Sequence, residues 1–184
     1  MLVLGTKQVT KGMTMNTKSN GFSLIELLIV VAIILIIAAI AIPNFLRSRV
    51  AANQASAVES LRALSTAEFT YSSTYNVGYT ATLGYLGPPP FGSADDISHA
   101  DIVDNVLSGT AAGGSTAMTS TKNGYLFTYS PGVSITGQVL SFTIHADPVN
   151  RGTTGLNSYF VDQTGVVRQN GSTQASAADS PLAG

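Results

Sequence analysis

A single carboxylate, Glu26, lies inside an otherwise apolar stretch of the sequence. From Phe22 to Ile42 there are 21 residues, and only Ser23 and Glu26 are polar. A helix of that length would cross roughly 30 Å of hydrocarbon. An ionised side chain inside such a span costs about 2.5–3.5 kcal/mol on insertion scales. The sequence therefore predicts a membrane span whose carboxylate either pairs with a cation or lies near the membrane interface.

The residues before this stretch supply a second pattern. Residues 1–21 carry three lysines and no acidic residue, and they end at Gly21, directly before the aromatic Phe22. Together with the apolar run and Pro43-Asn44, this pattern resembles the class III signal of type IV prepilins and type II secretion pseudopilins. The resemblance is carried by the basic leader, Gly21, Phe22, Ser23-Leu24-Ile25, Glu26, Leu27-Leu28-Ile29-Val30-Val31 and Pro43-Asn44.

The resemblance implies specific roles for three residues. A prepilin peptidase would cut between Gly21 and Phe22, and Phe22 would then be N-methylated. Glu26 would become the fifth residue of the mature chain, where the family carries a glutamate that pairs with the terminal amine of a neighbouring subunit. Residues 1–21 would be a cytoplasmic leader. Translation from Met1, Met13 or Met15 remains open, and a start at Met15 would give a short leader of the kind common in the family.

Two simpler interpretations compete with this one. A secretory signal peptide could be cleaved near Ala39-Ile40-Ala41, although its apolar core would be unusually long. A plain single-span anchor could hold Glu26 at the membrane interface. The basic residues do not decide the orientation, because Arg47, Arg49 and Arg62 follow the span just as three lysines precede it. The orientation therefore depends on the cleavage signal.

The helix is expected to continue beyond the span. No glycine or further proline occurs between Pro43 and Ser72. Apolar residues recur there at helical spacing, with Arg47, Asn53, Glu59 and Arg62 largely off the stripe formed by Val50, Ala57, Leu61, Leu64, Ala67 and Tyr71. Residues 22–43 thus read as an assembly half that is apolar all round, and residues 44–72 as an amphipathic half. Pro43 predicts a kink, a local loss of helix, or the end of the helix.

Residues 73–184 predict a globular domain. The segment 73–123 is rich in glycine and proline and contains recurring tyrosines, which indicates a structured variable loop. A short helix is expected over Asp95–Leu107. Antiparallel strands are expected within 124–170, followed by a flexible tail; they cover Tyr125–Tyr129, Val139–His145, Asn157–Asp162 and Val166–Gln169, with a turn at Gln163-Thr164-Gly165 between the last two. Leu140, Phe142 and Ile144 are expected to share one face. The resulting fold class is α+β, with a long helix packed on a small antiparallel sheet, as in pilins.

Composition narrows the classes of function. The chain has 184 residues, no cysteine and a net charge of −1. Loss of the leader removes three of nine basic residues and leaves six against ten acidic ones, or −4. No basic surface for nucleic acid is implied. Without cysteine there can be no disulfide, thiolate metal site or thiol nucleophile. Many pilins close a C-terminal loop with a disulfide, and this sequence must hold that region by packing.

Catalytic patterns are absent, and no cofactor is expected. His99 and His145 are the only histidines, and His145 is read as solvated or capping. Four aspartates could bind calcium, or they could cap and solvate a helix: Asp95, Asp96, Asp101 and Asp104. Five aromatics might form an electron-transfer stack, but core packing and loop anchoring are the preferred explanation for Phe45, Phe69, Tyr71, Tyr75 and Tyr79.

The sequence therefore predicts a structural protein rather than an enzyme. It would be a prepilin that waits in the bacterial inner membrane, loses residues 1–21 and polymerises with copies of itself into a surface filament, with Gly21, Phe22, Glu26 and Pro43 as its processing and assembly residues. Its partners would be itself, the prepilin peptidase and the pilus assembly machinery. The alternatives are a periplasmic type II secretion pseudopilin and, from another class, a membrane-tethered binding domain. A domain of 112 residues after Ser72 favours the surface pilin.

Overall fold

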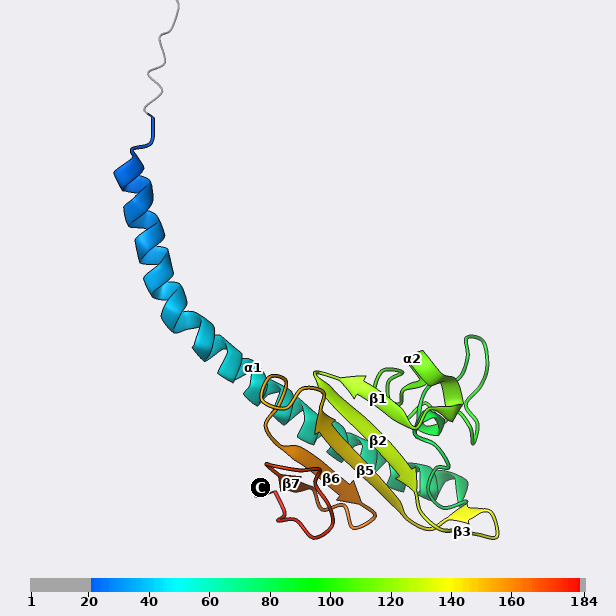
Figure 1. Ribbon diagram of the computed structural model, residues 1–184. Helices are drawn as coiled ribbons and strands as arrows, with labels where there is room; N and C mark the ends of the chain where they lie inside the picture. The colour runs from blue at the N-terminus through cyan, green and yellow to red at the C-terminus, as the bar shows by residue number, and fades with distance from the viewer. Residues whose placement is uncertain (1–20, 183–184) are drawn as a thin grey trace, which may run out of the picture. The chain divides into compact units, whose positions relative to one another are not determined.

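The computed structural model describes residues 21–182, which belong to two compact units (Figure 1). The first unit ends at Ala41, and the second begins at Ile42. Most of the expected leader, residues 1–20, lies outside the described residues. The confirmed fold class is α+β, with one long helix and a small antiparallel sheet.

Helix α1, Leu24–Tyr75, contains Pro43. A proline lacks the backbone N–H of a helical residue and crowds the carbonyl four residues earlier. Even so, the helix continues through Pro43, so the expectations of local melting or of a helix end at this residue are wrong. The helix ends three residues later than expected, where Asn76 takes the left-handed φ of 55° that typically stops a helix.

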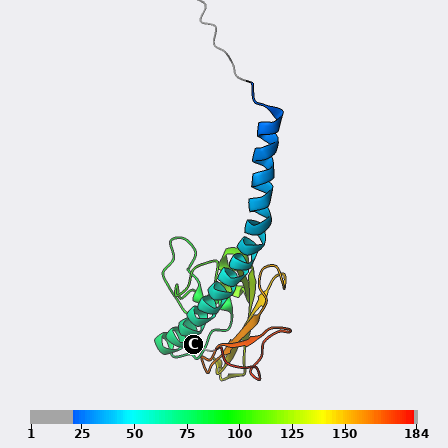
Figure 2. The same cartoon turned by 90° about the vertical axis from the view of Figure 1, so that its left-hand side faces the viewer.

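The second half of α1 is amphipathic, as predicted. Five of the six stripe residues are buried, and Val50 is half-buried; the buried ones are Ala57, Leu61, Leu64, Ala67 and Tyr71. Glu59 and Arg62 lie off the stripe and form an exposed ion pair with an N–O distance of 3.0 Å. The stripe faces the sheet, and Figure 2 shows this part of α1 beside the strands.

The main sheet has five strands in the order β1-β2-β5-β6-β7, and all neighbours are antiparallel. Its strands are β1 Thr119–Lys122, β2 Tyr125–Pro131, β5 Phe142–Pro148, β6 Ser158–Asp162 and β7 Arg168–Asn170. A separate two-stranded hairpin is made by β3 Ser134–Ile135 and β4 Gln138–Val139. The short helices are η1 Leu83–Leu86, α2 Thr110–Gly113 and η2 Gly114–Thr116.

The core lies between α1 and one face of this sheet. Alternate residues of the two central strands point inward and are fully buried, as period-two alternation requires. They are Tyr125, Phe127 and Tyr129 of β2 and Phe142, Ile144 and Ala146 of β5. These side chains meet the stripe of α1 in one apolar cluster.

The strand predictions were right for β2 and β6 and partly wrong for the strand between them. The expected strand Val139–His145 is split, because β4 ends at Val139 and β5 begins at Phe142. Leu140 between them is 50% exposed and does not share the buried face of Phe142 and Ile144. Strand β7 starts two residues later than expected. The glycine of the turn expected before it, Gly165, has a left-handed φ of 73°. Strands β1 and β3 were not predicted.

The helix expected over Asp95–Leu107 does not exist. Asp101 has a φ of 48°, which interrupts any right-handed helix. The two neighbouring carboxylates stabilise separate turns instead. Asp96 accepts the Ser98 N–H at 2.7 Å, and Asp104 accepts the N–H groups of Val106 and Leu107 at 3.0 and 2.9 Å. Local side-chain bonds of this kind compete with helix formation.

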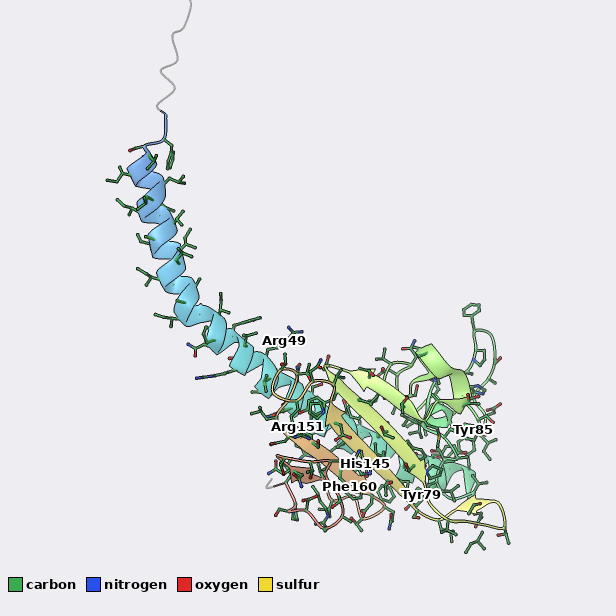
Figure 3. The ribbon with its side chains drawn as sticks, viewed as in Figure 1. Arg49, Tyr79, Tyr85, His145, Arg151 and Phe160 are labelled. Carbon is green, nitrogen blue, oxygen red and sulfur yellow. The ribbon has the colours of Figure 1, made fainter. Side chains whose placement is uncertain are left out.

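Residues 171–182, within the segment expected to be a flexible tail, pack on the sheet. Ala175 is fully buried, and Leu182 packs on the core and donates its N–H to the Val167 carbonyl at 2.8 Å. Arg151 fastens this segment to the loop after β5 (Figure 3). Its guanidinium donates to the carbonyls of Leu156, Gly171 and Thr173 and to the Ser158 hydroxyl. These contacts hold the C-terminal region in place in a domain without disulfides, together with its packing on the core.

Candidate functional site

The candidate site is the apolar start of α1. Gly21, Phe22 and Ser23 precede the helix, which begins at Leu24. Every large apolar side chain from Phe22 to Ile42 is between 45% and 80% exposed. Among the described residues, α1 is the helix long and apolar enough to cross a membrane, and none of its apolar window is buried. A surface of this kind needs lipid or protein to cover it.

Glu26 lies in the first turn of α1, and its side chain is exposed. Backbone N–H groups without intrahelical partners give a helix start a partial positive charge, which stabilises a carboxylate there. Ser23 and Glu26 also have the spacing of a capping box. The helix start therefore offsets part of the cost of this charge. Glu26 still lies in the same apolar segment as Phe22, as the sequence predicted.

Gly21 lies in an open environment. A Cβ atom built on this residue would meet no heavy atom of residues 21–182 within 4 Å. Neither packing nor a left-handed backbone requires glycine at this position. The reason for glycine here must therefore be sought outside the described structure.

The four aspartates weighed as calcium ligands are not brought together. Asp96 and Asp104 are engaged in turns, and Asp104 also pairs with Lys122 at 3.0 Å. A hydrogen bond from the Ser98 N–H lowers the pKa of Asp96. Asp95 and Asp101 are exposed. Within residues 21–182, no three acidic or histidine side chains converge to hold a metal ion.

The histidines and aromatics form packing contacts. His145 is half-buried, and its ring lies 5.1 Å from that of its register partner Phe160 on the neighbouring strand β6 (Figure 3). His145 is therefore neither freely solvated nor the cap of a helix. Phe69, Tyr79 and Phe142 form an edge-to-face cluster with centroid distances of 4.8–6.3 Å. Tyr71 and Tyr75 pack against each other at 4.9 Å. Phe45 is 68% exposed. Core packing explains Tyr71, Tyr75 and Tyr79, whereas Phe69 is 42% exposed and contacts the core through the rings of Tyr79 and Phe142.

A buried carboxylate, Glu68, was missed from the sequence. Its side chain is fully buried, and it accepts the backbone N–H of Thr80 at 3.0 Å and the Thr80 hydroxyl at 2.6 Å. Tyr129 donates its hydroxyl to the Thr80 carbonyl at 2.7 Å. Burial raises the pKa of Glu68 to about 7. Glu68 lies four residues after Leu64 and three before Tyr71, which places it in the apolar stripe. This spacing could have predicted that the side chain is buried.

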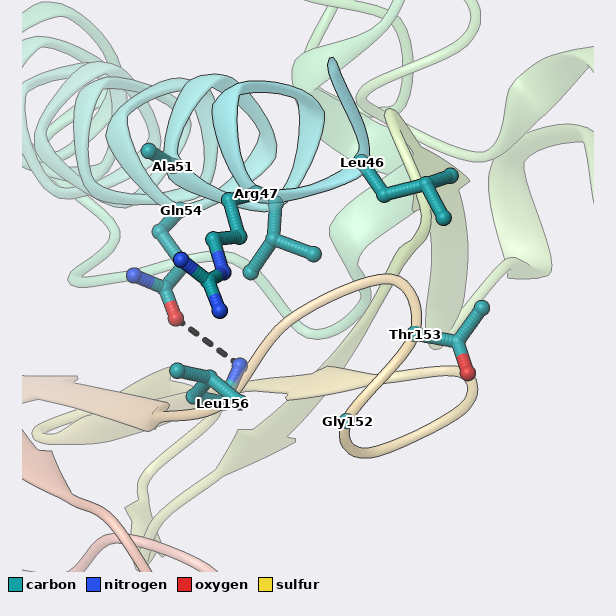
Figure 4. A pocket seen from close by; sticks show the side chains of 8 residues that line it. Leu46, Arg47, Ala51, Gln54, Gly152, Thr153 and Leu156 are labelled. Carbon is teal, nitrogen blue, oxygen red and sulfur yellow. Dashed lines mark hydrogen bonds between the residues drawn. The ribbon is translucent and has the colours of Figure 1, made fainter. Parts of the chain in front are cut away.

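A surface groove beside α1 was also missed. Figure 4 shows this helix–loop groove, which has a volume of about 340 Å³ and lies wholly within the second unit. It is lined by Leu46, Arg47, Val50, Ala51 and Gln54 of α1 and by Gly152, Thr153 and Leu156 of the loop after β5. About one hundred residues of sequence separate its two walls, so no local pattern could have indicated it.

Comparison with known proteins agrees with the N-terminal pattern. Residues 16–42 match the prokaryotic N-terminal methylation motif. The chain is 52% identical over 58 residues to the type IV major pilin protein PilA of Myxococcus xanthus (strain DK1622). The match covers 32% of this chain and 26% of that relative, so the chain matches about a quarter of the relative's length. No solved structure matches.

The match to the methylation motif, residues 16–42, includes the start of α1, whose large apolar side chains are exposed. The second half of the same helix carries an α+β domain of the kind that the sequence resemblance implied. In its N-terminal segment, the chain is similar to proteins with the prokaryotic N-terminal methylation motif and to a type IV major pilin.

Proposed function

We propose that the chain is the structural subunit of a type IV pilus. A prepilin peptidase removes residues 1–21, the new terminus at Phe22 is N-methylated, and the mature chains polymerise through residues 22–42. Before assembly the protein waits in the bacterial inner membrane, and afterwards it belongs to an extracellular filament built by the pilus assembly machinery. The observation that carries the proposal is that the methylation motif coincides with a helix segment whose large apolar side chains are all exposed.

The open geometry around Gly21 supports the proposed cleavage step. The fold does not require glycine here, and Phe22 is 74% exposed, so an extended backbone can enter a peptidase active site without displacing packed side chains. The absence of a side chain at Gly21 gives the peptidase an unhindered scissile position. The same local freedom leaves the Phe22 amine accessible to a methyl-transferring enzyme.

The assembly step follows from the surface that α1 presents. In the membrane, lipid covers residues 22–42. Outside it, each large apolar side chain left in water would forgo about 1.5–3 kcal/mol of burial free energy. Equivalent helices of neighbouring subunits provide that cover in a filament. Glu26 docks the positively charged terminal amine of a neighbour, which fixes the register of one helix on the next.

The test is the covalent structure of the mature protein. Mass spectrometry of envelope fractions should find a terminus at Phe22 that carries one extra methyl group, and electron microscopy should find filaments that contain this chain. A peptidase-deficient strain should retain the leader, and its intact mass would identify the start at Met1, Met13 or Met15. A mature terminus after Ala41 would indicate a secreted domain. An uncleaved chain without filaments would indicate a membrane-tethered domain, and either result contradicts the proposal.

A further inference from the structure

The loop that forms one wall of the helix–loop groove is held firmly against α1. Gln54 accepts the N–H groups of Leu156 and Asn157 at 2.8 and 3.3 Å, as Figure 4 shows for Leu156. Asn53 donates its side-chain amide to the Thr154 carbonyl at 2.9 Å. A Cβ atom at Gly155 would collide with the Tyr125 ring, so the loop lies in close contact with the sheet. The groove is therefore preformed, and an occupant meets little cost of ordering it.

The chemistry of the groove suits an aliphatic occupant. Its walls are mostly hydrocarbon, and Leu46 and Leu156 remain 52% and 53% exposed. The Gln54 carbonyl oxygen is already occupied by the loop. Small-molecule sites usually add several convergent polar groups that fix orientation. Arg47 and Thr153 are the other polar residues of the lining, but most of the groove surface is apolar, which favours contact with the aliphatic side chains of Leu, Ile or Val.

The chain itself contains the matching surface. Residues 22–42 are the longest exposed aliphatic segment among the described residues, and they have no polar face. Resting on the proposed function, we propose that the helix–loop groove receives aliphatic side chains from segment 22–42 of a second copy of this chain. The wall of the groove begins at Leu46, four residues after the end of that segment on the same helix. The assembly surface thus extends beyond α1 to the loop that carries Leu156.

This contact joins two different surfaces of the same chain. The groove of one copy is filled by the helix of the next, and the groove of that copy stays free for a third. Heterologous contacts of this kind generate rings when they close and open helical polymers when they do not. A groove-to-helix contact is therefore compatible with a filament, whereas a groove that paired with itself would stop at a dimer.

Site-specific photo-crosslinking in assembled filaments tests the contact. A benzophenone amino acid at Leu156 of the full-length chain should crosslink to peptides from residues 22–42 of another copy. Val149 provides the matched control, because it is also 53% exposed and follows β5 but does not line the groove. The same photoreactive residue at Val149 should give few or none of these crosslinks. Crosslinks from Leu156 only to lipid, or only to the neighbour's residues beyond 44, would overturn the inference.

A pair of charge substitutions supplies a second readout. Leu156→Asp would place a carboxylate in the groove and should lower filament yield about tenfold or more, because a charge would be buried without a partner. Val149→Asp should assemble normally. Equal yields from both variants would overturn the inference. If wild-type filaments form but Leu156 contacts other surfaces, only this inference fails; if the wild-type chain forms no filaments, the proposed function fails with it.

Discussion

Glu26 combines two electrostatic environments in one residue. It lies in the first turn of α1, where the helix start stabilises a negative charge by about 0.3–1 kcal/mol. It also lies in a segment whose other residues, Ser23 apart, are apolar, where the same charge is expensive. The helix start alone offsets only part of the free-energy cost of this charge in the apolar segment. A neighbouring amine is the partner that would offset the rest.

Replacing Glu26 by glutamine separates these effects. Glu26→Gln keeps the side-chain volume and removes the charge, so membrane insertion should improve slightly or stay unchanged while filament assembly falls. Sheared filament mass, measured against precursor in the membrane, reports both quantities. Glu59→Gln is the control, because Glu59 is an exposed carboxylate on the same helix outside the apolar segment. Normal filament yield from Glu26→Gln would show that the carboxylate is merely tolerated.

Glu68 gives the domain a stability that depends on pH. Its carboxylate is buried beside Thr80 and near the ring of Tyr129. Burial raises the pKa of Glu68 to about 7, from 4.5 for an exposed glutamate. The neighbouring tyrosines stay neutral across this range, since burial also raises the pKa values of Tyr71, Tyr79 and Tyr129. The folded state therefore binds a proton that the unfolded state releases between these two values.

Because the folded state holds this proton more tightly than the unfolded state, the protein loses stability as pH rises. Wild-type stability should be highest at or below the unfolded pKa, fall as pH rises through the window from 4.5 to about 7, and then level off. Glu68→Gln should remove this dependence on pH. Above about pH 7, its free energy of unfolding should be higher than that of the wild type by up to about 3 kcal/mol. Urea unfolding of the protein in detergent micelles at several pH values measures it. Glu59→Gln should retain the wild-type slope, and a slope that survives in Glu68→Gln would assign it to another group.

At the scale of elements, Arg151 joins the loop after β5, strand β6 and the C-terminal segment. Its planar guanidinium donates to four oxygens in different directions. A lysine ammonium cannot reproduce this fork. Arg151→Lys should lower the free energy of unfolding by about 1–3 kcal/mol and speed hydrogen exchange in residues 171–182. Arg62→Lys, which alters only an exposed ion pair, should change neither quantity. Unchanged exchange in Arg151→Lys would remove Arg151 as the fastening residue.

The elements that could be predicted are those specified by local periodicity. The α1 stripe and the alternation in β2 each repeat over several residues, so the sequence was sufficient. Strand β1 has the sequence Thr-Ser-Thr-Lys, which offers no apolar alternation, and it forms because β2 supplies its partner. The expected helix at 95–107 failed because Asp96 and Asp104 bond to nearby backbone and Asp101 takes a left-handed φ. These outcomes depend on individual residues rather than on a repeating pattern.

The candidate site divides in the same way. Gly21, Phe22 and Glu26 could be proposed from the sequence because they lie within six consecutive residues, and their processing and assembly roles stay predictions. The helix–loop groove and the Glu68–Thr80 contact join residues that fold together only through tertiary structure. Buried polar contacts and surface hollows of this kind are set by long-range packing. For that reason, the groove and the buried Glu68 contact could not be predicted from the sequence alone.

At the scale of the whole molecule, we expect assembly and folding to depend on different units of the chain. Within residues 21–41, the described part of the first unit, no side chain is buried, whereas the second unit contains the apolar cluster between α1 and the sheet. A fragment beginning at Arg49 should therefore be soluble, monomeric and folded, with mixed α and β circular dichroism, and it should not polymerise. Fibres formed by this fragment would place assembly in the globular domain. An unfolded fragment would show that the stripe of α1 is not part of the core.

The fastening by Arg151 also bears on where the domain can mature. A disulfide closes only where an oxidant is present, and it opens when thiols reduce it. Hydrogen bonds from a guanidinium need neither, and this chain has no cysteine to oxidise or mispair. The domain can therefore complete its fold without a disulfide-forming enzyme. A filament made of such subunits should keep its mechanical integrity in strongly reducing surroundings, where disulfide-closed pilins lose a crosslink.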